Sequence, residues 1–300
     1  VQVINFGAAS ADCCPDGMGG VWIAQMIYPG ISETHVVVQH IDADGYRPLG
    51  LDGLYVTSVP NSYLCGIETG LNGDCVVMYT IPVEVGQDFV HDIYAQRISQ
   101  QGELLWGDEG VDISTHPADY KIPVYWDTDS STESDDAGGL WGFWVTGVGA
   151  IDIRLCGVNA DGTLKLPNGD RIAGSVSYSQ WTRDSQFVGD GSGGITLMFP
   201  QWADGYNFTR RHFLANRILA DGTPLYNEPQ LVMDWPQDDI GGYGAPFHIQ
   251  RDPLGGYVLT TYGYWQRLTD DLVPLWDIEG APVYDWDPPF WNLDHVSNPV

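Results

Sequence analysis

Carboxylates are the most abundant side chains in this sequence that could do chemistry, with 40 Asp and Glu residues against 12 Lys and Arg. Two carboxyl groups about 5–5.5 Å or about 6.5–9.5 Å apart are sufficient to cleave a glycosidic bond. Glu68, Asp127 and Asp184 follow predicted strands at similar places and are candidates for such a group. Because near matches arise by chance among so many acids, the sequence does not single out a catalytic pair.

A second group of acids lies in the polar stretch "DTDSSTESDD" (127–136), which we interpret as an insertion in a loop. Its Asp127, Asp129, Asp135 and Asp136, together with Glu133, are hard oxygen ligands that suit calcium. The stretch lacks the glycine-centred spacing of an EF-hand, so a solvated loop is the alternative interpretation. Calcium is the one cofactor that the sequence suggests.

Nucleophilic and zinc-dependent chemistry find little support. The stretch "GDGSGGI" around Ser192 superficially fits a G-x-S-x-G nucleophile turn, but it coincides with a turn that recurs along the chain. The sequence holds no CxxC pair and no His/Cys cluster with zinc spacing. We therefore interpret Ser192 as a structural residue.

The charge balance restricts the partners. A net charge of −28 excludes nucleic acid and disfavours an anionic membrane surface, because both require clustered Lys and Arg. No apolar run reaches the roughly 18–20 residues that span a membrane. The chain begins at Val1 without a signal-like segment, and we expect a secreted or cell-surface protein whose signal has been removed.

Five cysteines fit an oxidising compartment. Cys65 and Cys75 flank a predicted turn in "CGIETGLNGDC", and facing strands would bring them within bonding distance. We therefore predict a disulfide between them. The sequence does not predict the state of Cys13, Cys14 and Cys156.

Internal repeats indicate the fold. The segment "DIYAQRISQQGELLWGDEGVDIS" (92–114) matches 36–58 and 264–285 at constant offsets, and weaker copies lie at 154–172 and 214–232. A Gly-Gly or Asn-Gly turn and an apolar strand precede each copy, and another short strand precedes each turn. Asp-Gly pairs supply the positive φ of tight hairpins. We expect the aromatic plates Trp106, Tyr226 and Trp276 to pack between neighbouring units, and the Gln-Arg pairs to bond edge carbonyls or bridge units.

The pattern resembles the blade repeats of secreted bacterial β-propellers, and more distantly the "DG…LW" hairpin of quinoprotein-type propellers. The resemblance covers roughly residues 1–286 and implies an all-β, five-bladed β-propeller with four antiparallel strands per blade. It does not imply an activity, since propellers include lectins, hydrolases and scaffolds. A quinone cofactor is not implied. We expect the ring to close through the termini, since an open ring leaves an unpaired edge.

The first strand of each unit should line the central channel. It contributes Tyr63, Tyr125, Gln180 and His248 as candidate ligand-binding residues. Residues 287–300 do not fit the period, and we interpret this segment either as a tail folded against the body or as a docking segment for another protein. With the neighbouring Trp286, the candidate partner-binding residues are Trp286, Phe290 and Trp291.

These features support a non-catalytic extracellular module that binds a protein or a glycan in a surface assembly. The alternative is a carbohydrate-active hydrolase that uses carboxylates at the channel mouth.

Overall fold

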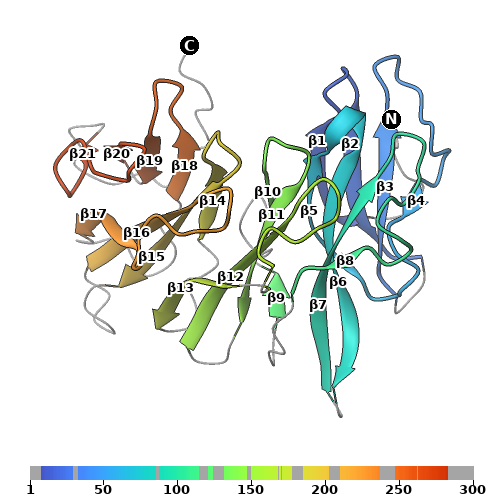
Figure 1. Cartoon of the computed structure of the whole chain (residues 1–300), viewed down its shortest axis with the longest axis horizontal. Helices are drawn as coiled ribbons and strands as arrows, with labels where there is room; N and C mark the ends of the chain where they lie inside the picture. Colours follow the sequence, from blue (N-terminus) through green and yellow to red (C-terminus); the bar gives the residue numbers. More distant parts are fainter. Residues whose placement is uncertain are drawn as a thin grey trace.

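In its described residues, the computed structural model is an all-β fold of five antiparallel sheets, each built on a path of four strands, which follow one another in an arc (Figure 1). The structure describes residues 8–29, 33–85, 88–114, 121–123, 132–146, 150–167, 169, 171–177, 185–202, 210–236, 247–261 and 263–282. The predicted sheet number and strand number are confirmed. The predicted boundary at residue 286 lies outside the described residues.

Strand order follows the chain within every sheet. The first sheet holds β1 (Ala8–Pro15), β2 (Val21–Ile27), β3 (His35–Ile41) and β4 (Leu54–Tyr55), and the second holds β5 (Tyr63–Thr69), β6 (Cys75–Val85), β7 (Asp88–Ile98) and β8 (Val111–Asp112). The third sheet holds β10 (Thr132–Ser134), β11 (Leu140–Thr146), β12 (Ala150–Val158) and β13 (Arg171–Ser177), with β9 (Lys121–Pro123) also paired to β11. The fourth sheet holds β14 (Gln186–Gly189), β15 (Ile195–Trp202), β16 (Arg210–Ile218) and β17 (Gln230–Pro236), and the fifth holds β18 (Phe247–Arg251), β19 (Tyr257–Thr261), β20 (Tyr264–Leu268) and β21 (Ala281–Pro282).

The first strands of consecutive sheets contact one another, and we call β1, β5, β10, β14 and β18 the inner strands. We call the face of a sheet that packs on the next sheet in the chain its forward face, and the opposite face its backward face. Each forward face packs on the backward face of the sheet that follows. The cores between the sheets are aliphatic and aromatic, with fully buried Trp22, Trp141 and Phe213 among their largest side chains. Phe143 stacks on Phe187 between the third and fourth sheets. Contacts between consecutive sheets therefore hold the fold together.

Tight hairpins join the third and fourth strands of each sheet. Gly45, Gly162 and Gly222 take φ values of +81°, +87° and +80°, as the Asp-Gly pairs predict. In the fifth sheet Leu272 takes the corresponding position with φ +58°. The left-handed backbone conformation is unfavourable for leucine, and burial of the Leu272 side chain, which is 2% exposed, offsets this cost.

The predicted disulfide between Cys65 and Cys75 is wrong. All five cysteines are free thiols. Cys65 belongs to the core on the forward face of the second sheet, whereas Cys75 belongs to the core shared with the first sheet. The register pairs Cys75 with Thr69, and a bulge lies between Leu64 and Gly66. The two thiols therefore project from opposite faces of the sheet and cannot meet.

The acidic stretch 127–136 is not a continuous loop. Thr132–Ser134 form β10, which pairs with β11, and Asp135 and Asp136 open the turn between these strands. Asp127 and Asp129 lie outside the described residues. Within the described part of the chain, the only helical segment is a short 3-10 turn, η1 (Leu71–Gly73), and no helix is long and apolar enough to cross a membrane.

Candidate functional site: carboxyl groups on the inner strands

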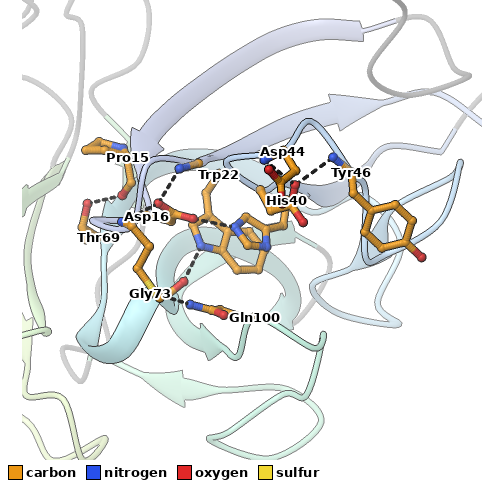
Figure 2. A network of polar contacts seen from close by, with 12 residues as sticks. Pro15, Asp16, Trp22, His40, Asp44, Tyr46, Thr69, Gly73 and Gln100 are labelled. Atoms are coloured by element: carbon orange, nitrogen blue, oxygen red, sulfur yellow. Dashed lines mark hydrogen bonds and ion pairs between the residues drawn. The ribbon is translucent and has the colours of Figure 1, made fainter.

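At the hairpin end of each sheet a carboxylate pairs with a histidine, an arginine or a lysine. In the first sheet the Asp16 carboxylate accepts from the backbone N–H groups of Met18 and Gly20 and lies 2.9 Å from His40 Nε2 (Figure 2). The His40 ring stacks on Trp22, whose Nε1 donates to the carbonyl of Gly73 in the second sheet. Burial alone would raise the pKa of Asp16, but these hydrogen bonds outweigh it and hold the pKa below its usual value.

In the fourth and fifth sheets an arginine takes the place of His40 beside the carboxylate. Arg217 Nε lies 2.9 Å from Asp190 Oδ2, and Arg267 Nε lies 2.7 Å from Asp252 Oδ2. Asp190 is fully buried, and hydrogen bonds from Ser192, Arg217 and Gly194 lower its pKa against the effect of burial. Ser192 donates its hydroxyl to Asp190, which supports its interpretation as a structural turn residue.

The second and third sheets reach the same pairing by different routes. In the second sheet the carboxylate moves to the far end of the turn, where Asp74 lies 2.6 Å from Arg97. In the third sheet Gly157 stands where other sheets have the cation, and Lys165 from the following hairpin lies over it and pairs with Asp135 at 2.7 Å. The Asp135 carboxylate therefore pairs with Lys165 and accepts hydrogen bonds from the backbone of its own turn. The described residues contain no group of three or more acids, histidines or cysteines arranged to hold a metal ion.

A different set of carboxyls lies on consecutive inner strands. Asp12 on β1 accepts from the backbone N–H of Ile67 at 3.2 Å. Glu68 on β5 accepts from the Thr132 hydroxyl on β10 at 2.7 Å. Glu133 on β10 accepts from the N–H of Gly189 on β14 at 2.9 Å. Each carboxyl therefore links its own strand to the next one.

These carboxyls are half-buried and electrostatically coupled. Burial raises the pKa of Glu68 to about 8, and the nearby charges of Glu133 and Asp12 add to the effect. Burial also raises the pKa of Glu133. Glu68 is therefore a neutral acid at pH 7, able to donate and to accept hydrogen bonds. Burial raises the pKa of the adjacent Cys14 to about 12, so its thiol is not a nucleophile.

The four candidate ligand residues are only partly placed. Tyr63 is half-buried on β5, with its ring edge-on to His91 at 5.3 Å between centroids. His248 is exposed on β18, three sheets further along, so the two do not form one described pocket. Tyr125 and Gln180 lie outside the described residues, as do the predicted partner residues Trp286, Phe290 and Trp291.

Sequence reasoning missed how Asp12 and Glu133 relate to Glu68. They lie far apart in the chain, and only the contact between successive inner strands brings them together. The available signal was the position of Glu68 and Glu133, each two residues before the start of a glycine-containing turn.

Comparisons with known proteins agree with the fold. No family model matches the sequence, and no curated protein matches it. Among solved structures, a polysaccharide lyase of family PL25, an ulvan lyase, has 13% identity and a TM-score of 0.51. The same kind of enzyme bound to -[GlcA(1-4)Rha3S]- gives 12% and 0.50. A protein of unknown function from Dyadobacter fermentans gives 12% and 0.48, with 93% of this chain and 84% of that chain covered.

The match with the ulvan lyase covers 86% of this chain but 63% of that chain. The likeness is to a propeller-type fold and, at this level of identity, it shows the fold alone.

Proposed function

We propose that the five sheets are blades of a β-propeller, and that this extracellular module binds an uncharged glycan at its inner strands without hydrolysing it. The proposal depends on the three carboxyls on consecutive inner strands, Asp12, Glu68 and Glu133. One oxygen of each glutamate is bonded within the fold, which leaves acceptor capacity for sugar hydroxyl groups.

The charge of the chain favours an uncharged ligand. A net charge of −28 repels polyanions. The ulvan lyase of similar fold was solved with a repeat of glucuronic acid and sulfated rhamnose. A ligand of that charge does not suit a chain with this negative net charge, so we expect a neutral polysaccharide instead.

The test compares Glu68→Leu with Glu103→Leu. Both substitutions remove one carboxyl, but Glu103 is exposed on the hairpin of the second sheet, away from the inner strands. Migration is measured in native gels that contain neutral polysaccharides such as β-glucan, xylan or arabinan. We expect retardation of the wild type and of Glu103→Leu, and its loss in Glu68→Leu, which has neither a donor nor an acceptor for sugar hydroxyl groups. Equal retardation of all three proteins would refute binding at the inner strands.

One observation favours hydrolysis as the second candidate. A carboxylic acid that stays protonated at pH 7 is the form that a general acid requires, and Glu68 has a pKa of about 8. Chromogenic glycosides distinguish the two functions. Turnover by the wild type that is abolished in Glu68→Gln and retained in Glu103→Gln would replace the binding function by hydrolysis.

A further inference from the structure

An arginine on the third strand bridges consecutive sheets at two of the interfaces. Arg97 in the second sheet pairs with Asp74 of its own sheet, and its Nη1 donates to the carbonyl of Ala160 in the third sheet at 2.7 Å. Arg217 in the fourth sheet also pairs with a carboxylate of its own turn, and its Nη1 donates to the carbonyl of Asp270 in the fifth sheet at 3.3 Å. Each guanidinium therefore lies between its own turn and the hairpin of the next sheet.

The third sheet lacks this arginine. Gly157 pairs with the second residue of β11, as Arg97 pairs with the second residue of β6 and Arg217 with that of β15. Lys165 replaces the missing guanidinium only in part, because its ammonium pairs with Asp135 at 2.7 Å and its described hydrogen bonds stay within the third sheet. The bridge from the third sheet to the hairpin of the fourth is therefore missing.

The hairpin of the fourth sheet keeps an acceptor at the matching place. Ala220 is the second residue of its turn, as Ala160 and Asp270 are of theirs. Within the described part of the chain, no group donates to the Ala220 carbonyl. Arg171 also crosses this interface, but its Nη1 donates to the Gly222 carbonyl, two residues further along. The acceptor that an arginine binds at two other interfaces is thus open here.

A pocket of about 650 Å³ lies at this place, between the turns and hairpins of the third and fourth sheets. Ligand pockets typically measure about 300–1,000 Å³, so an arginine side chain fits within it. All residues of its lining belong to the described part of the chain, and both of the sheets that form it are interior. The lining includes Asp135, Asp136, Asp161, Lys165, Gly193 and Ala220.

The lining attracts a cation, since it holds three carboxylates against one ammonium. Lys165 pairs with Asp135, which leaves two exposed carboxylates, Asp136 and Asp161. Hydrogen bonds from the hydroxyl and the backbone N–H of Thr163 hold the pKa of Asp161 below its usual value, so this carboxylate is ionised at neutral pH. Among the residues that the structure describes, no acids are arranged to hold a metal ion, which favours an organic cation.

We propose that this pocket binds the guanidinium group of an arginine side chain on a partner peptide. The guanidinium donates to the Ala220 carbonyl, as the internal arginines do at the equivalent carbonyls, and Asp136 and Asp161 balance its charge. An ammonium is less suitable, because only the planar fork of five N–H donors can bond a carbonyl and a carboxylate side by side. The pocket does not use Glu68 or Glu133, so the proposal is independent of the glycan site.

The experiment is calorimetric titration with the blocked tripeptide acetyl-Gly-Arg-Gly-amide. The same tripeptide with citrulline keeps the shape of the side chain without its charge, and we expect it to bind at least about tenfold more weakly. The tripeptide with lysine should also bind more weakly than the arginine tripeptide. Methylguanidinium tests the guanidinium group without a peptide backbone, and we expect it to compete with the arginine tripeptide.

Variants of two exposed hairpin acids locate the site. Asp161→Asn should weaken binding about threefold to fivefold, since asparagine keeps the acceptor for Thr163 but loses the charge. Asp221→Asn is the matched control. Asp221 accepts from Thr223 in the hairpin of the fourth sheet, beside an interface that Arg217 already fills, so binding should not change.

The overall acidity of the chain is the competing explanation, because a net charge of −28 attracts any cation. It predicts equal binding of the arginine and lysine tripeptides, and equal losses in Asp161→Asn and Asp221→Asn. Either result would overturn the proposal, as would the absence of binding at millimolar peptide. In spectra of protein labelled with ¹⁵N-glycine, the arginine tripeptide should shift the pocket residues Gly191 and Gly193. Shifts at other glycines in their place would also overturn it.

Discussion

Replacing Glu68 with glutamine should remove a pH-dependent loss of stability. A glutamate carboxyl has a pKa of 4.5 when it is exposed, as in the unfolded chain, and burial raises the pKa of Glu68 to about 8 in the fold. Between these values the folded chain holds a proton that the unfolded chain has released. The free energy of unfolding therefore falls as pH rises from about 4.5 to about 8, and the loss is complete above pH 8.

The size of the effect follows from the two pKa values. They differ by about 8 − 4.5, or about 3.5, which corresponds to roughly 4.8 kcal/mol in the absence of screening. Glu68 is half-buried, so solvent reduces this figure, and we expect about 1–2 kcal/mol between pH 5 and pH 9. Glutamine cannot ionise, and it retains an oxygen that accepts from Thr132.

The assay is urea unfolding of the wild type, Glu68→Gln and Glu103→Gln at pH 5, 7 and 9. Glu133 also has a raised pKa, so some pH dependence should remain in every protein. We expect the stability of Glu68→Gln relative to the wild type to increase from pH 5 to pH 9, and that of Glu103→Gln to stay constant. Parallel pH profiles for Glu68→Gln and the wild type would refute the assignment of a buried neutral acid.

Three further substitutions or modifications test the interior. Lys165→Met leaves the buried Asp135 carboxylate without its cation, and we expect a loss of about 3 kcal/mol in the free energy of unfolding, measured in urea. Trp22→Phe removes the indole donor to the Gly73 carbonyl, with an expected loss of about 1–3 kcal/mol and a lower Tm by calorimetry. In dilute native protein only Cys13 should react rapidly with iodoacetamide, because the other four thiols are buried; mass spectrometry identifies the modified residue.

The sequence predicted the parts of the fold that depend on local chemistry. The Asp-Gly hairpins recur because each turn needs a residue at positive φ, and constant offsets revealed them. The Gln96 side chain bonds the loop of its own sheet and Arg97 bridges to the next sheet, as the repeated pair suggested. The ion pairs escaped notice because their members do not align: Asp74 replaces a turn glycine, and Lys165 replaces a strand arginine.

The candidate site was less accessible to sequence reasoning. Glu68 stood out by its place at the end of a strand, but its contact with Thr132 joins residues 64 positions apart. Spacing alone could not decide which face of β5 carries Cys65, since one bulge alters the alternation. The wrong disulfide prediction and the missed carboxyl cluster have a common cause. Both depend on which face of a strand a side chain occupies and on the register between strands, and sequence patterns supply neither.

Because the contacts described here join only consecutive sheets, the molecule behaves energetically as a one-dimensional array. Every strong contact described above joins a sheet to itself or to the next one, so the free energy is approximately a sum of sheet terms and interface terms. Among the described residues, an interior sheet is held by two interfaces, whereas the first and the fifth sheet are each held by one. Opening should therefore start at the first and fifth sheets, and the third sheet, around Trp141 and Trp144, should exchange its amide hydrogens last.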